Sequence, residues 1–164
     1  MNEGLFLTSL LRPLETDELL YMTEGRVNVI PSDYATGRTP AGTMVIANTD
    51  PSWLPGSHWV TMLICENRTG YYYDTAGQPP SAYETFKEFM DSNCDNGWYF
   101  NDIMIQQPGT PACGHHAVLF CMCVMQGVHP HSVVEMYSDN LLANDYFAAM
   151  WACAVWPEIN FFSD

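Results

Sequence analysis

The sequence predicts an α+β domain, because its helical and strand-forming segments are grouped and do not alternate regularly. Runs rich in aromatic and β-branched residues are concentrated in the middle of the chain, as expected for neighbouring strands. A long apolar helical segment follows them, and further helical segments fill the C-terminal part. Hydrophobic residues make up 48% of the 164 residues, which is enough for the core of one domain spanning residues 1–164.

The first helix is predicted around Thr16, which is a capping residue type followed by Asp17 and Glu18 in the first helical turn. It extends to about Met22. The next stretch is rich in proline and glycine, and we expect loops around a single short strand at 43–48.

A hairpin is the clearest element of the sequence. The runs His58–Ile64 and Gly70–Asp74 are aromatic and β-branched, and the residues between them favour a turn. A helix is expected at 81–90, where apolar residues recur at near-helical spacing, and another strand at 98–106.

The second half is predicted to be mainly helical. Pro108–Pro111 breaks the preceding strand, and a long apolar helix begins near Cys113 and ends near Gln126. Two further helices are expected at 132–137 and 145–155.

The charge balance excludes some classes of partner. The chain has 19 acidic and five basic residues, a formal net charge of −14, so it repels nucleic acid and anionic lipid. No run of about 18 apolar residues predicts a membrane span. The N-terminus lacks a basic start and a small-residue cleavage site, so we expect a protein of the cell interior or of a particle, not a secreted one.

The six cysteines are predicted to be free thiols, because most lie in apolar runs and no secretory signal precedes them. No CxxC pair is present. Cys121 and Cys123 would point to different faces of a helix, so we predict no zinc site and no other metal centre.

Cys113 has the sequence context of a nucleophile. It opens the apolar helix, where the positive end of the helix field favours the thiolate form of sulfur. Pro111 suits an early helical position, and Gly114 leaves space beside the sulfur. None of the other five cysteines has such flanking residues. A cysteine at a helix start is still, by itself, more often structural than catalytic.

His58 and Asp74 supply a base and its orienting acid. His58 opens the first strand of the hairpin, Asp74 closes the second, and an antiparallel return brings these two ends together. A histidine can accept the thiol proton, and a carboxylate fixes its tautomer. Each residue alone could equally be structural: His58 a satisfied strand histidine, Asp74 a turn former.

A glutamine before Cys113 could complete an oxyanion hole together with the backbone N–H of Cys113. Gln106 and Gln107 are the two candidates, and either could also be an ordinary loop residue.

Four features of the sequence, taken in order, resemble the adenovirus protease (adenain) family. They are His58-Trp59, an acidic residue sixteen positions after the histidine, Gln-Gln-Pro, and Ala-Cys-Gly. That family shares a clan with the SUMO- and ubiquitin-like-protein proteases. The segments 45–51 and 56–59 are similar to adenain-like proteases of adenovirus-related viruses and of Polinton (Maverick) elements. The resemblance covers about residues 40–128.

The resemblance implies a papain-like fold, with a central mixed sheet packed by helices and the nucleophile at the N-terminus of a buried helix. It assigns Cys113 as nucleophile, His58 as base and Asp74 as the orienting acid. The cellular pattern selects Gln107 as oxyanion donor and the adenoviral pattern selects Gln106; we favour Gln107 because Gln-Gln-Pro reproduces the cellular motif.

Substrate contacts are implied for three further residues, Trp59, Trp53 and Gly56. Trp59 is expected to pack over the catalytic ring, and the loop that contains Trp53 and Gly56 to roof a narrow cleft that prefers glycine near the scissile bond.

The chain departs from the family at two points. Cys113 follows Asp74 by only 39 positions, so recognition surfaces between them must be reduced. The family also uses a basic viral peptide and DNA as activators, and Cys94 stands near the position of its peptide-linked cysteine. The flanking Asn93 and Asp95 predict an exposed thiol at Cys94, which we interpret as unlinked in preference to tethered, and the charge of −14 opposes activation by DNA.

The predicted function is therefore that of a cysteine endopeptidase that cleaves viral structural precursor proteins, next to glycine, during particle maturation in the host cell or virion. No cofactor is required by this chemistry. Two alternatives remain open: an isopeptidase that removes ubiquitin or SUMO, and a catalytically silent binding protein with a protease fold.

Overall fold

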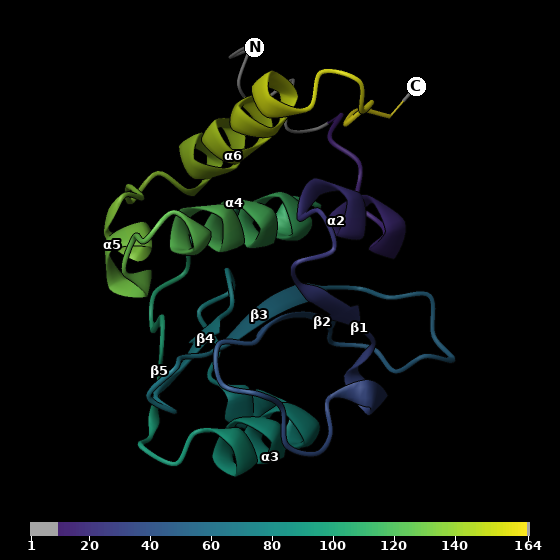
Figure 1. Ribbon diagram of the computed structural model, residues 1–164. Helices are drawn as coiled ribbons and strands as arrows, with labels where there is room; N and C mark the ends of the chain where they lie inside the picture. The colour runs from purple at the N-terminus through teal and green to yellow at the C-terminus, as the bar shows by residue number, and fades with distance from the viewer. Residues whose placement is uncertain (1–9, 164) are drawn as a thin grey trace.

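The computed structural model of the chain describes residues 10–163. It contains a five-stranded mixed sheet with helices on both faces (Figure 1). The α+β class predicted from the sequence is confirmed. Within residues 10–163, every helix is too short or too polar to cross a membrane.

The strand order in the sheet is β1-β2-β3-β4-β5, so each strand pairs with its neighbours in sequence. The pairs β2–β3 and β3–β4 are antiparallel, whereas the outer pairs β1–β2 and β4–β5 are parallel. The bounds of the strands are β1 Asn28–Ile30, β2 Met44–Asn48, β3 Trp59–Ile64, β4 Gly70–Tyr73 and β5 Trp98–Phe100.

The helices form layers above and below this sheet. Helices α2 and α4 cover one face, α3 covers the other, and α6 packs on the outer side of α4 (Figure 1). Because α4 lies between the sheet and α6, its first nine residues are all buried, which explains why its sequence is apolar apart from His115 and His116. The bounds are α2 Thr16–Met22, α3 Glu84–Asn93, α4 Cys113–Met125, α5 Pro130–Glu135 and α6 Leu141–Val155.

Strand β3 is buried on both faces because the pleat sends alternate side chains to opposite sides of the sheet. Trp59 and Leu63 belong to the hydrophobic cluster beneath α4. Val60, Met62 and Ile64 belong to the cluster above α3. The hairpin therefore forms the centre of the protein, with a hydrophobic cluster on each of its faces.

The predicted helices are all present, with shifted ends. The N-cap of α2 is Glu15 and not Thr16, and its backbone N–H donates to Oε1 of Glu18 at 3.2 Å. Helix α6 begins four residues earlier than predicted, because the side chain of Asn140 accepts from the N–H of Ala143 at 3.1 Å. Helices α3 and α5 are displaced by two or three residues, since short turns and proline set their first positions.

The strand predicted at 98–106 is wrong beyond Phe100. The partner strand β4 ends at Tyr73, so no backbone is available to pair with the continuation. Residues 101–107 instead form a loop beside the end of β4. The prediction also missed β1, whose three residues are held in place by pairing with β2.

Candidate active site

The hairpin brings His58 and Asp74 into contact. His58 directly precedes β3 and Asp74 directly follows β4, and the register pairs Thr61 with Tyr73. The Nε2 atom of His58 lies 2.7 Å from Oδ1 of Asp74. The carboxylate therefore engages Nε2 and does not occupy Nδ1, and Cys113 is a further neighbour of the ring.

Asp74 is held firmly below the surface, with 1% of its area exposed. Its backbone N–H donates to Oδ1 of Asn101 at 2.8 Å, and the amide of Asn101 donates back to the carbonyl of Asp74. The N–H of Ala76 donates to Oδ1 of Asp74 at 2.9 Å. Asn101 was not identified from the sequence, although an asparagine just after a strand is a residue type that imitates backbone pairing in this way.

Cys113 is the first residue of α4 and lines a surface cleft. The start of α4 packs closely against Leu14 and against Trp59 of β3, and it can do so because Gly114 has no side chain. A Cβ atom at Gly114 would lie 3.0 Å from Leu14 and 3.3 Å from the indole of Trp59. Cys113 is largely buried, yet its side chain reaches both of the clefts described below.

The surroundings of His58 favour its protonated form. Burial lowers the pKa of His58, but hydrogen bonds to Asp74 and Cys113, together with the charges of those two groups, outweigh burial and raise the pKa to about 10. At neutral pH the ring is therefore an imidazolium between a buried carboxylate and the sulfur of Cys113.

Two clefts meet at this group. The first, the N-terminal cleft, has a volume of about 510 Å³ and lies between residues 13–17 and the loop 48–59. The second, the glutamine cleft, has a volume of about 540 Å³ and is bounded by residues 104–111. Both clefts share five lining residues: Pro13, Gly56, Ser57, His58 and Cys113.

The N-terminal cleft is acidic. Apart from His58, the charged side chains among its described lining residues are Glu15, Asp17 and Asp50. The loop that forms its outer wall is braced by Asp33, which accepts from the backbone N–H and hydroxyl of Ser52 at 2.6 and 2.7 Å. This wall is therefore fixed in position although it contains little regular structure.

The two candidate glutamines have different environments. The amide of Gln106 is committed at both ends, because Oε1 accepts from Thr75 at 2.6 Å and Nε2 donates to the carbonyl of Thr110 at 2.6 Å. Gln107 is exposed and lines the glutamine cleft with Cys113. The geometry therefore favours Gln107 as the donor that can face a substrate.

The three residues expected to contact substrate also differ. Gly56 lines both clefts and has φ of +95°, and a Cβ there would lie 2.7 Å from the side chain of Asn48. Trp59 lines the N-terminal cleft but is 8% exposed, and its indole donates to the carbonyl of Leu14 at 2.9 Å. Trp53 is 75% exposed, and the lining of the described clefts includes its neighbours but not Trp53 itself.

The predicted exposure of Cys94 is wrong. The residue is 6% exposed, its sulfur packs against Gly70 of β4, and it belongs to the same hydrophobic cluster as Met90. Burial raises the pKa of this thiol to about 11. The polar neighbours misled the prediction because Asn93 also turns inward, where it donates to the carbonyl of Phe89 at 2.9 Å.

Among residues 10–163 no group of three or more potential ligands gathers closely enough to hold a metal ion, and the six cysteines are free thiols. The reactive groups at and next to the junction of the clefts are thus the thiol of Cys113, the imidazole of His58, the carboxylate of Asp74 and the amide of Gln107. This set is chemically suited to acyl transfer through a covalent thioester.

No protein-family model and no curated protein matches the chain. Among solved structures it is similar to the crystal structure of the selenomethionine-labelled ASFV pS273R protease, with 18% sequence identity and a TM-score of 0.41. The similar region covers 64% of this chain and 43% of that protein, so the chain spans less than half of its length. At this level of likeness the function has to be inferred from the site itself.

Proposed function

We propose that the protein is a cysteine peptidase with Cys113 as nucleophile, His58 as acid–base residue and Asp74 as the residue that orients His58. One observation carries this proposal: the ring of His58 stands between a buried carboxylate, at 2.7 Å, and a thiol at a helix N-terminus, where two clefts meet. A structural histidine does not need a thiol partner or access to substrate.

In the proposed reaction the Cys113 thiolate attacks the carbonyl carbon of the scissile peptide, and the carbonyl electrons move to oxygen. The backbone N–H of Cys113 and the amide of Gln107 donate to this oxyanion. The tetrahedral intermediate then collapses, and the leaving amine takes its proton from Nδ1 of His58. Neutral His58 next deprotonates a water molecule, which attacks the thioester and releases the thiolate.

We propose an extended polypeptide as the substrate, and cleavage within the chain. The N-terminal and glutamine clefts are both lined by His58 and Cys113 and otherwise have largely different lining residues, so together they offer room for a polypeptide that continues past the scissile bond. The resemblance of the sequence to adenain adds glycine near that bond, viral structural precursors as substrates, and maturation of particles in the host cell and virion. Because Cys94 is buried, we propose that activity needs no peptide linked at this thiol.

The first test is selective labelling of the thiols. We expect a fluorescent iodoacetamide at low concentration to alkylate Cys113 faster than the other cysteines, and Cys113→Ala to abolish this signal. Cys123→Ala is the matched control, because it removes a half-buried thiol from the same helix outside the clefts. Labelling spread evenly over the six thiols would support a catalytically silent binding protein.

The second test compares substrates for the protein alone, without peptide or DNA. We expect cleavage of fluorogenic peptides and of unfolded proteins after glycine, and no cleavage by Cys113→Ala. Faster turnover of substrates that contain folded ubiquitin or SUMO than of short peptides with the same C-terminal glycines would favour an isopeptidase.

A further inference from the structure

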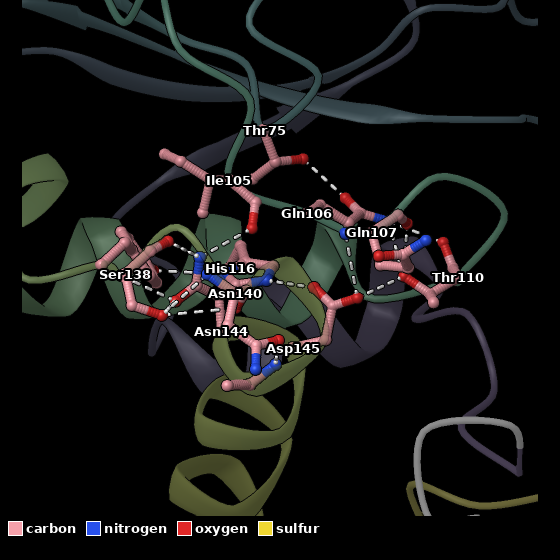
Figure 2. A network of polar contacts seen from close by, with 12 residues as sticks. Thr75, Ile105, Gln106, Gln107, Thr110, His116, Ser138, Asn140, Asn144 and Asp145 are labelled. Carbon is pink, nitrogen blue, oxygen red and sulfur yellow. Dashed lines mark hydrogen bonds and ion pairs between the residues drawn. The ribbon is translucent and has the colours of Figure 1, made fainter. Parts of the chain in front are cut away.

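A second histidine–aspartate pair lies behind the site. Nε2 of His116, in α4, lies 2.8 Å from Oδ1 of Asp145, in α6, and both side chains are fully buried (Figure 2). Neither residue is among those that line the two clefts. This pair could not be predicted from the sequence, because 29 positions separate its members and no local motif connects them.

The other oxygen of Asp145 holds the loop that leads to the nucleophile. Oδ2 accepts from the backbone N–H of Gln107 at 3.2 Å and from the hydroxyl of Thr110 at 2.7 Å (Figure 2). The hydroxyl of Thr110 also lies 3.0 Å from the carbonyl of Gln107. The carboxylate thus fastens both sides of the turn at Pro108-Gly109 to α6.

This loop has few other supports. Gln107, Pro108 and Gly109 are exposed, and the turn contains a positive φ of +85° at Gly109. On its N-terminal side the bonds of Gln106 to Thr75 and Thr110 hold it against the end of β4. Between Gln106 and Cys113 the bonds from Asp145 are therefore the main connection to the helical layer.

His116 holds the Asp145 carboxylate through a chain of hydrogen bonds. When Nε2–H of His116 donates to Asp145, Nδ1 accepts from the hydroxyl of Tyr137 at 3.1 Å. Tyr137 in turn accepts from the hydroxyl of Tyr73 at 3.3 Å. This order gives each polar group in the chain from Tyr73 to Asp145 a hydrogen-bond partner.

We propose that Asp145 is a positioning residue of the peptidase. It sets the backbone of Gln107 and Thr110 so that the side-chain amide of Gln107 faces the oxyanion that forms beside Cys113. An oxyanion donor must be placed within a fraction of an ångström to lower the barrier, and a loop without this anchor cannot place it. The inference rests on the proposed function, since it concerns a step of that reaction.

The test uses two chemistries at one sulfur. Peptide cleavage needs the oxyanion donors, whereas alkylation of Cys113 by iodoacetamide forms no oxyanion and needs only the thiolate. We expect Asp145→Ala to lower kcat by roughly 10- to 100-fold, on the scale of a displaced catalytic group, and to leave the alkylation rate within about twofold of wild type.

Asp145→Asn is the matched control. Its remaining oxygen can accept from Gln107 and Thr110, while its amide donates to Nε2 of His116 after the ring shifts its proton to Nδ1. We expect this variant to keep most of the activity. Thr110→Val removes the hydroxyl that donates to Asp145, together with its contacts to Gln107 and Gln106, and leaves the buried pair intact. We therefore expect the same selective loss of kcat, to a smaller extent, even if Asp145→Ala does not fold.

The variant Gln107→Ala completes the design. If Asp145 acts through Gln107, adding Asp145→Ala to Gln107→Ala causes little further loss of kcat. Three results would overturn this inference and leave the proposed function standing. The first is a wild-type kcat in Asp145→Ala, and the second is an equal loss of peptide cleavage and of alkylation in that variant. The third is a double variant whose loss of kcat is the product of the two single losses. A wild-type protein that cleaves no peptide would overturn the proposed function and this inference with it.

Discussion

The two histidine–aspartate pairs of this protein have nearly the same length, 2.7 and 2.8 Å, and different surroundings. His58 lies at the junction of two clefts with a thiol beside it, and 21% of its side chain is exposed. His116 is fully enclosed, and its partners are a tyrosine and a carboxylate that holds a loop. The comparison teaches that a histidine–carboxylate contact does not by itself mark a candidate catalytic group; exposure in a cleft and a neighbouring thiol are what distinguish His58 from His116.

The sharpest way to break this comparison is to replace each histidine by leucine. His58→Leu should lower kcat/KM by roughly 10⁴-fold, the scale of losing a triad member. It should also lower the free energy of unfolding, because it leaves the buried carboxylate of Asp74 without its ring partner. His116→Leu leaves the buried carboxylate of Asp145 without its ring partner and should cost about 3 kcal/mol or more of stability. Peptide kinetics and urea unfolding measure the two effects. Equal losses of activity in two equally folded variants would contradict the distinction.

The adjacent glutamines repeat the contrast within one loop. Gln107→Ala removes the exposed amide and should lower kcat by about 10²- to 10³-fold without loss of stability. Gln106→Ala breaks the bonds to Thr75 and Thr110 and should destabilise the protein by about 1–3 kcal/mol. A thermal melt and a single-turnover assay on both variants separate the two roles. If instead Gln106→Ala slowed turnover without loss of stability, Gln106 and not Gln107 would be the oxyanion donor.

The pH dependence separates the cleft histidine from the others. The pKa of His58 is raised to about 10 from 6.5, so the folded protein binds the proton more tightly than the unfolded chain. The resulting stability is fully present below about pH 6.5 and is lost as the pH rises through about 10. Activity should fall over the alkaline part of this range as the imidazolium loses its proton. Asp74→Asn removes the carboxylate charge that helps to raise the pKa of His58, so activity should fall at a lower pH in this variant than in the wild type. An unchanged pH dependence would exclude deprotonation of His58 as the cause of the fall.

His115 is a third buried or partly buried histidine to compare with His58 and His116, and its replacement should have the smallest effect of the substitutions considered. His115 is buried near the start of α4, and neither of its ring nitrogens has a hydrogen-bond partner among the described residues. Burial lowers its pKa to about 3. Between pH 6.5 and about 3 the unfolded chain binds the extra proton, so the protein loses stability as the pH falls. His115→Leu should raise the free energy of unfolding by about 1–2 kcal/mol and flatten its decline in acid. A destabilised variant would show that this ring has a partner in solution.

Much of the candidate site could be predicted because its parts have local signals. A histidine opening a strand, an acid closing the next strand and a cysteine opening a helix each follow from nearby residue types, and hairpin geometry alone brings His58 to Asp74. The β3–β4 hairpin and helix α4 were predicted almost to the residue for the same reason. Asn101, by contrast, acts through contacts with a distant turn, and the sequence around it resembles a continuing strand.

The sequence by itself determined the order of the elements, the acidic charge and the residue types available for chemistry at Cys113, because these depend on composition and on short-range periodicity. Only the tertiary structure decided that Cys94 is buried, that Gln106 is committed and Gln107 is not, and that Asp145 anchors their loop from α6. The physical reason is that burial and hydrogen-bond partnership are properties of pairs of residues far apart in the chain, and packing alone brings such residues together.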